Sequence, residues 1–159
     1  MTDVKYSFLG FLISVSLIFN IIGFFTPNWT NTQLELELRK ISPKWLIAAS
    51  SLMIATLVFA VIMIAIYLYV YFKIKNNDYS EELRKWLRII DLSALLSIIS
   101  TVTAVILIAN FSSQRPYYPT QGRNADLITL GYSAWLSLIA AIINVGTLSI
   151  SEYIASEEC

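Results

Sequence analysis

Four long apolar stretches without any charged residue are the feature that most constrains how this chain folds. They run from Tyr6 to Phe25, Trp45 to Phe72, Leu92 to Phe111 and Leu127 to Ser151. The 11 basic and 11 acidic residues all lie outside them. A helix rises about 1.5 Å per residue, so about 20 residues cross a hydrocarbon core about 30 Å thick. The sequence therefore predicts an all-α membrane protein, a bundle of four transmembrane helices.

The segments between the stretches are too short to form a second domain. Chains below about 40 residues rarely fold without disulfides or metals, and the longest connections have 19 residues. We therefore treat residues 1–159 as a single four-span membrane domain. The predicted spans are 6–25, 45–72, 87–111 and 127–151, with extracellular loops at 26–44 and 112–126 and a cytoplasmic loop at 73–86.

The cytoplasmic loop ends in a pattern typical of a helix start. Ser80 is a good N-cap residue, and the pair Glu81-Glu82 suits the first turn of a helix. We expect a helix to begin near Ser80 and to continue without a break into the third span. In that helix, Leu83, Trp86 and Leu87 are expected to lie towards the lipid headgroups.

The composition excludes several classes of function. Histidine is absent and Cys159 is the one cysteine, which removes the usual general base, the commonest metal ligand and any intrachain disulfide. We find no catalytic, cofactor-binding or metal-binding constellation and expect a non-enzymatic protein without a cofactor. The net charge of zero, without a basic stripe, argues against a nucleic-acid partner.

The orientation in the membrane is predicted mainly from two glycosylation sequons. With the N-terminus inside, six basic residues are cytoplasmic and five are external, a bias too slight to orient the chain. Asn28-Trp29-Thr30 and Asn110-Phe111-Ser112 both fall on the external side of that topology. We therefore expect both termini in the cytoplasm, a plasma-membrane location, and candidate glycosylation at Asn28 and Asn110.

One short segment of the first extracellular loop has the pattern of a strand. Leu34, Leu36 and Leu38 alternate with charged residues, and strict alternation is the period of a half-buried strand. An isolated strand is not stable, so it needs partners, and the start of this loop and the second extracellular loop are the candidates. The sequence predicts a small extracellular β-sheet that caps the bundle.

Small residues recur at four-residue spacing in the last two spans. Helices in lipid associate through close packing of small residues and through side-chain hydrogen bonds. These stripes are therefore expected to face other helices. The residues concerned are Ser93, Ser97, Thr101, Ser133, Ser137 and Ala141.

Two amides, Asn20 and Asn144, stand in otherwise apolar spans. We interpret them as donors and acceptors of structural hydrogen bonds within the bundle, with an ion path as the weaker alternative. No acidic or basic residue lies within any of the four apolar stretches, and such residues are the usual components of proton relays and charged-substrate pathways. A channel or transporter is therefore disfavoured.

Two short motifs carry a resemblance to a known family. Pro27-Asn28-Trp29 follows the first span, and Gly131-Tyr132-Ser133-Ala134-Trp135-Leu136 opens the fourth. With the four-span layout and the strand-bearing loop, the chain resembles the claudin superfamily, which includes claudins, peripheral myelin and epithelial membrane proteins and the gamma/TARP channel subunits. The resemblance implies a claudin-like bundle with an extracellular sheet, and it makes Trp29 the aromatic anchor at the base of that sheet.

The first loop departs from the family pattern. The family's loop is usually longer and carries two disulfide-bonded cysteines, whereas this loop has 19 residues and no cysteine. The surface with which claudins line a paracellular pore is therefore not expected here.

Three classes of function remain. The favoured one is an interaction protein surrounded by membrane lipids that binds other integral membrane proteins, as an auxiliary subunit of a larger protein such as an ion channel. The alternative within that class is a cell-junction component that associates with copies of itself. A small channel or transporter ranks next, and a membrane enzyme last.

Overall fold

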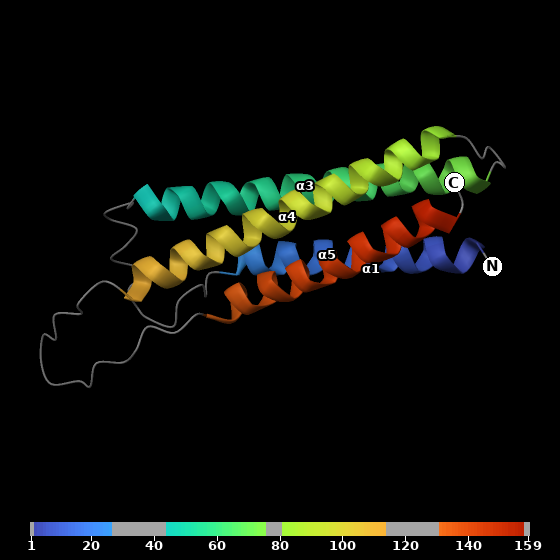
Figure 1. Ribbon diagram of the computed structural model, residues 1–159. Helices are drawn as coiled ribbons and strands as arrows, with labels where there is room; N and C mark the ends of the chain where they lie inside the picture. The colour runs from blue at the N-terminus through green and yellow to red at the C-terminus, as the bar shows by residue number, and fades with distance from the viewer. Residues whose placement is uncertain (1, 27–43, 76–80, 114–130, 158–159) are drawn as a thin grey trace, which may run out of the picture.

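The computed structural model describes residues 2–26, 44–75, 81–113 and 131–157, and it places four long helices in them (Figure 1). They are α1 (Thr2–Phe25), α3 (Lys44–Lys75), α4 (Glu81–Ser113) and α5 (Tyr132–Glu157). Each contains an apolar window long enough to cross a membrane. The prediction of four helical spans is confirmed for the described residues. The predicted sheet falls on residues outside them and stays a prediction.

The third span and the segment before it form one helix. α4 runs from Glu81 to Ser113 without interruption, in agreement with the capping pattern at Ser80 to Glu82. The expected lipid-facing position of Leu83 and Leu87 is wrong, however, because both side chains are buried in the core. They are covered because α3 continues to Lys75 and packs alongside the first turns of α4.

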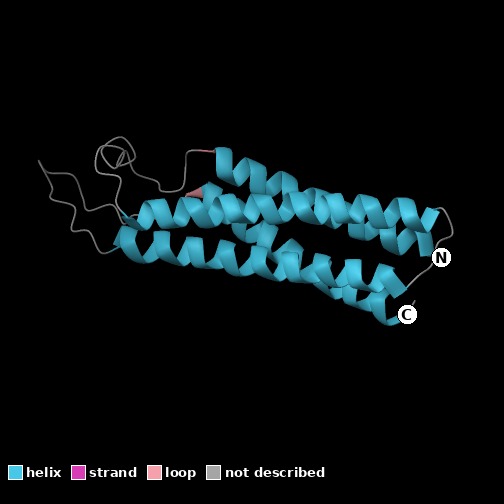
Figure 2. Ribbon diagram, turned by 90° about the horizontal axis from the view of Figure 1, so that it is seen from above, coloured by secondary structure: helices cyan, strands magenta, loops and turns pink. Residues whose placement is uncertain are grey.

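The helices form a ring in which each one packs against two neighbours. Contacts are most extensive between α3 and α4, followed by α1 with α5 and α4 with α5, and they are sparsest between α1 and α3. Over the described ranges, the diagonal pairs α1/α4 and α3/α5 have no close backbone approach. Figure 2 shows the four helices side by side, with both chain ends at the same end of the bundle.

The interior changes character along the bundle axis. Near the chain termini it holds large apolar side chains from all four helices, including Leu9, Met63, Leu87 and Ile154, each almost completely buried. Farther from the termini, the buried positions are mostly small or polar residues, which allow helices to approach closely. The two halves are therefore held together in different ways, one by apolar packing and the other by close approach and hydrogen bonds.

Candidate functional site

The centre of the polar half is Asn144 of α5, whose side chain is fully buried. The hydroxyl of Ser16 in α1 donates to Asn144 Oδ1 at 2.6 Å, and Asn144 Nδ2 donates to Ser97 Oγ of α4 at 3.1 Å. The amide oxygen of Asn144 thus accepts a hydrogen bond from α1, and its amide nitrogen donates one to α4. It links α1 to α4, which do not pack directly against each other.

Further polar contacts extend from this centre. Asn20 Nδ2 reaches Ser16 Oγ at 3.5 Å within α1, and the hydroxyls of Thr56 in α3 and Thr101 in α4 lie 3.4 Å apart. Buried polar groups are costly in an apolar medium unless they are hydrogen-bonded. Asn144 makes the interhelical bonds of a structural amide, whereas Asn20 makes a single long bond within its own helix.

The small-residue stripes are buried along their whole length. Ser93, Ser97, Thr101, Ser133, Ser137 and Ala141 are each at most 6% exposed. Their hydroxyls do not all reach across helices, because Ser137 Oγ donates to the Ser133 carbonyl and Thr101 Oγ1 to the Ser97 carbonyl, one turn earlier in each case. Ser133 Oγ instead donates to the carbonyl of Thr26 at the end of α1, at 3.1 Å.

Two glycines of α1 mark close approaches that the sequence analysis missed. A Cβ on Gly23 would lie 2.6 Å from Ser137 Oγ and 3.2 Å from the Ser133 carbonyl oxygen, so α1 meets α5 there with no room for a side chain. A Cβ on Gly10 would overlap the phenol ring of Tyr67 in α3. Glycine inside an apolar helix is the signal that could have found both, since small residues let helix backbones approach in lipid.

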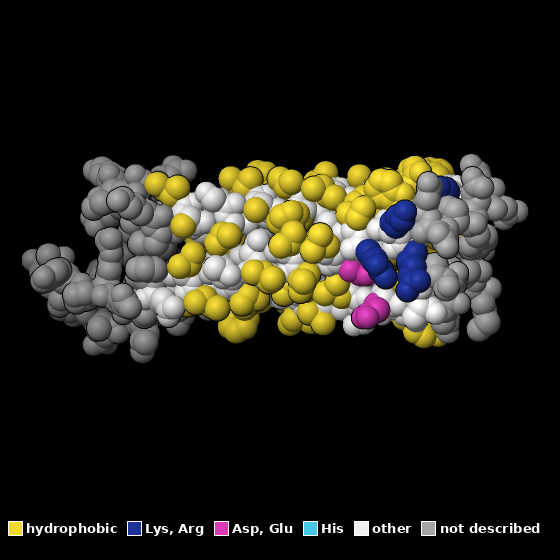
Figure 3. Space-filling model, turned by 45° about the horizontal axis from the view of Figure 1, so that its top comes forward, with side chains coloured by type: hydrophobic (Ala, Val, Ile, Leu, Met, Phe, Trp, Pro, Cys, Tyr) yellow, Lys and Arg dark blue, Asp and Glu magenta, His cyan; other side chains and the backbone are white. Residues whose placement is uncertain are grey.

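The outward faces of the helices are apolar. Figure 3 shows hydrophobic side chains along the length of the bundle and basic ones gathered near one end. α3 is the least covered helix, since 22% of its most apolar window is buried, compared with 33% in α1 and 39% in α4 and α5. Its outward face carries Ile54, Val58, Val61 and Leu68, each about half exposed. This face of α3 is open to lipid or to a partner helix.

Charged side chains lie near the end that holds the termini. Lys5 Nζ lies 4.8 Å from the ring centroid of Tyr153, which joins α1 to α5. Asp91 of α4 is half-buried and lies beside Ser151 and Glu152 of α5. In the part of the chain that the structure describes, no three His, Cys, Asp or Glu side chains gather closely enough to hold a metal ion.

The predicted external residues are only partly described. Asn110 is exposed and lies near the end of α4. The remaining residues, Asn28, Trp29, Leu34, Leu36 and Leu38, lie outside the described residues. Glycosylation at both sequons and the roles of the sheet residues therefore stay predictions.

Comparison with known proteins identifies the family. A family model described as "Tight junction protein, Claudin-like" matches residues 1–159. No curated protein and no solved structure matches the chain significantly. The family match covers every helix of the bundle and confirms the resemblance seen in the two short motifs.

Proposed function

Because this chain belongs to the claudin-like tight junction family, we propose that it is a non-enzymatic tetraspan protein that works through lateral contact with other membrane proteins. Within that class we propose an auxiliary subunit of a larger membrane protein such as an ion channel. Two observations support this proposal. Most buried polar side chains of the interior are hydrogen-bonded within the bundle, either to one another or to backbone carbonyls. In addition, α3 has an outer face that no other helix covers.

The hydrogen-bonded interior argues against a channel or transporter in its own right. A conducting path needs polar groups that are available to water or to the ion. Here the Asn144 amide uses both its oxygen and its nitrogen on Ser16 and Ser97. The Thr56 and Thr101 hydroxyls lie within hydrogen-bond reach of each other and of carbonyls in their own helices. These contacts support a structural role for the polar core. We likewise propose that the buried small-residue stripes serve helix packing.

The junctional alternative has its own support. The description of the matching family names tight junctions, and self-association through α3 would use the same exposed face. Against it stands the 19-residue, cysteine-free first loop, because adhesion between cells requires a surface that reaches outwards. We therefore place the auxiliary role first and self-association second.

We also propose a plasma-membrane location with both termini in the cytoplasm. The termini lie at one end of the bundle, together with the ends of α3 and α4 that the 76–80 segment joins (Figure 1). This arrangement agrees with the sequons at Asn28 and Asn110 lying on the opposite side.

Site-specific photo-crosslinking in the native membrane tests the lateral surface. A photoreactive amino acid would replace Val58 on the exposed face of α3, Ile142 on the exposed face of α5 as the matched control, and Met63 as a buried control. The auxiliary role predicts an adduct with a larger membrane protein from Val58 that is absent from both controls. Adducts between copies of this chain would instead support the junctional role. Equal labelling from Val58 and Ile142 would contradict a partner surface on α3.

A further inference from the structure

One buried amide oxygen in the polar half of the bundle has no hydrogen-bond donor among the described residues. Asn20 of α1 is 1% exposed, and its Nδ2 makes one long bond, to Ser16 Oγ. Its Oδ1 is buried and accepts no hydrogen bond. An amide oxygen has two lone pairs, and burying it without a donor is costly. The Asn20 oxygen therefore needs a donor that the described side chains do not supply.

Turning the Asn20 amide over does not satisfy its oxygen. With oxygen and nitrogen exchanged, the oxygen would face Ser16 Oγ. A serine hydroxyl has one hydrogen, and Ser16 already donates it to Asn144 Oδ1 at 2.6 Å. In either orientation the amide oxygen lacks a donor.

A threonine hydroxyl of α4 lies at the same level of the bundle as Asn20. Asn20 lies one turn after Ser16 in α1, in the direction away from the termini. Thr101 lies one turn after Ser97 in α4, and α4 runs in the same direction as α1 (Figure 1). Both serines bond to the side chain of Asn144. Asn20 and Thr101 are therefore displaced from that amide by the same distance along the axis, about 6 Å.

A threonine of α3 completes this level. Thr56 Oγ1 lies 3.4 Å from Thr101 Oγ1. The close approach of Gly10 to the Tyr67 ring gives the same level independently. Asn20 lies ten residues after Gly10, about 15 Å along α1, and Thr56 lies a similar distance before the tyrosine in the antiparallel α3. We call Asn20, Thr56 and Thr101 the polar layer, and each is at most 1% exposed.

The polar layer has acceptors that lack a hydrogen. A threonine hydroxyl has one hydrogen. Thr56 donates it to the Leu52 carbonyl at 3.0 Å, and Thr101 donates it to the Ser97 carbonyl at 2.9 Å. Both bonds are shorter than the 3.4 Å between the two hydroxyl oxygens, so that contact has no hydrogen of its own. Three helices thus each contribute an oxygen acceptor for which the described hydrogen bonds supply no hydrogen.

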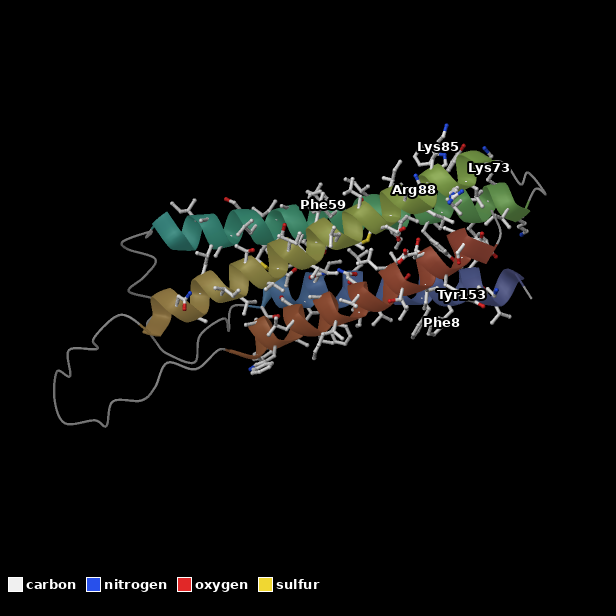
Figure 4. The ribbon with its side chains drawn as sticks, in the orientation of Figure 1. Phe8, Phe59, Lys73, Lys85, Arg88 and Tyr153 are labelled. Atoms are coloured by element: carbon white, nitrogen blue, oxygen red, sulfur yellow. The ribbon has the colours of Figure 1, made fainter. Side chains whose placement is uncertain are left out.

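The ligand that fits these acceptors is small, neutral and able to donate two hydrogens. Phe59, three residues after Thr56, lies near the middle of α3 (Figure 4). The same view shows basic side chains nearer the end that holds the termini, namely Lys73, Lys85 and Arg88. A cation in the layer would be costly, because the apolar stretches around it contain no charged residue to balance it. Water meets the requirement, since a buried water typically makes about three hydrogen bonds to otherwise unsatisfied polar groups.

We propose that the polar layer holds one water molecule that joins three helices. One hydrogen of the water is donated to Asn20 Oδ1, and the other is shared by the Oγ1 atoms of Thr56 and Thr101. The water thereby ties α1 to α3 and α4, on the side of the ring where direct contacts between helices are sparsest. It opens no path through the membrane, because large apolar side chains such as Met63 and Leu87 fill the core towards the termini. The site does not depend on a lateral partner, so either proposal can fail without the other.

Radiolytic footprinting of the wild-type protein tests for the water directly. X-ray radiolysis converts water to hydroxyl radicals, which oxidise nearby methionine to the sulfoxide, and mass spectrometry locates the product. Met53 lies three residues before Thr56, on the same face of α3, whereas Met63 lies in the apolar core. They are 3% and 0% exposed, so bulk water reaches neither. The proposal predicts rapid oxidation of Met53 but not of Met63, and a Met53 as unreactive as Met63 would overturn it.

Variants test whether Asn20 holds the water. Asn20→Leu replaces the amide by an apolar side chain of similar size and should abolish the oxidation of Met53. The matched control is Thr147→Val in α5, because Thr147 is also buried and donates to a carbonyl one turn earlier but lies outside the polar layer. It should leave the oxidation of Met53 unchanged. Oxidation of Met53 that persists in Asn20→Leu would refute the site.

A second variant covers the case in which Asn20→Leu does not fold. Thr56→Val combined with Thr101→Val keeps the shape of both side chains and removes the other two acceptors. This double variant should also lose the oxidation of Met53. Retention of wild-type reactivity would show that the threonines do not bind the water, against the proposal.

Discussion

The hydrogen bonds of Asn144 make a quantitative prediction about the stability of the bundle. Interhelical side-chain hydrogen bonds in membranes contribute about 0.6 kcal/mol on average and up to about 1.7 kcal/mol. Asn144→Ala removes two of them, to Ser16 and to Ser97. The Ser16 hydroxyl can turn to the Ala140 carbonyl oxygen, 3.3 Å away, so that bond is partly replaced. The Ser97 hydroxyl loses the amide donor without such a replacement.

We therefore expect Asn144→Ala to lower the free energy of unfolding by about 1–3 kcal/mol, including the small cavity it leaves. Reversible unfolding in mixed micelles, followed by far-UV circular dichroism, measures this change. A double-mutant cycle with Ser97→Ala removes the cavity contribution and should give a coupling energy of about 0.6–1.7 kcal/mol.

The matched control is Ser149→Ala on the same helix. Ser149 is exposed, and its hydroxyl bonds to the Val145 carbonyl of its own helix, so its loss should change stability by less than about 0.5 kcal/mol. It should show no coupling to Ser97→Ala. An absence of coupling between Asn144 and Ser97, or an Asn144→Ala variant as stable as Ser149→Ala, would refute the structural role of the amide.

Three further changes test the packing, the orientation and the sheet. Gly23→Ala should lower the free energy of unfolding by about 1–3 kcal/mol in the same assay, because the added Cβ would collide with α5. The control is Gly146→Ala, whose added Cβ would have its nearest neighbour at 3.7 Å, and it should be neutral or stabilising by up to about 1 kcal/mol. Equal costs of the two substitutions would contradict the close approach of α1 and α5 at Gly23. An impermeant maleimide should label Cys159, the one cysteine of the chain, only after cells are permeabilised, and labelling of intact cells would show that the C-terminus is external. Leu36→Lys places a charge on the predicted buried face of the strand and should prevent delivery to the cell surface, whereas Glu37→Lys changes the predicted polar face and should not. Surface biotinylation measures the delivery of both variants. Similar delivery of the two would contradict the predicted strand.

The sequence predicted the four helices because their signal is local. Twenty or more apolar residues without charge need no knowledge of neighbouring segments to be recognised as a span. The continuous helix through α4 was predicted for the same reason, since Ser80 and the two glutamates after it mark a helix start within a few residues.

What the sequence did not reveal depends on contacts between helices. Leu83 and Leu87 suit either headgroups or a neighbouring helix, and only the extension of α3 to Lys75 decides between them. Gly23 is one of several small residues in α1 until Ser133 and Ser137 of α5 are placed opposite it. The pairing of Asn144 with Ser16 and Ser97 joins residues more than forty positions apart, which no local pattern encodes.

The position of Asn144 has a consequence for how the protein is made. The backbones of α1 and α4 do not meet in the described ranges, and the hydrogen-bond path between them passes through α5, which the ribosome synthesises last of the four helices. Until α5 is inserted, the hydroxyls of Ser16 and Ser97 lack the amide that joins them. An assembly intermediate with three helices in the endoplasmic reticulum would therefore present polar groups to lipid, the kind of feature that chaperones and degradation factors can recognise in an unfinished membrane protein. The last helix would then serve as the checkpoint of biosynthesis, and truncations before residue 144 should be retained and degraded.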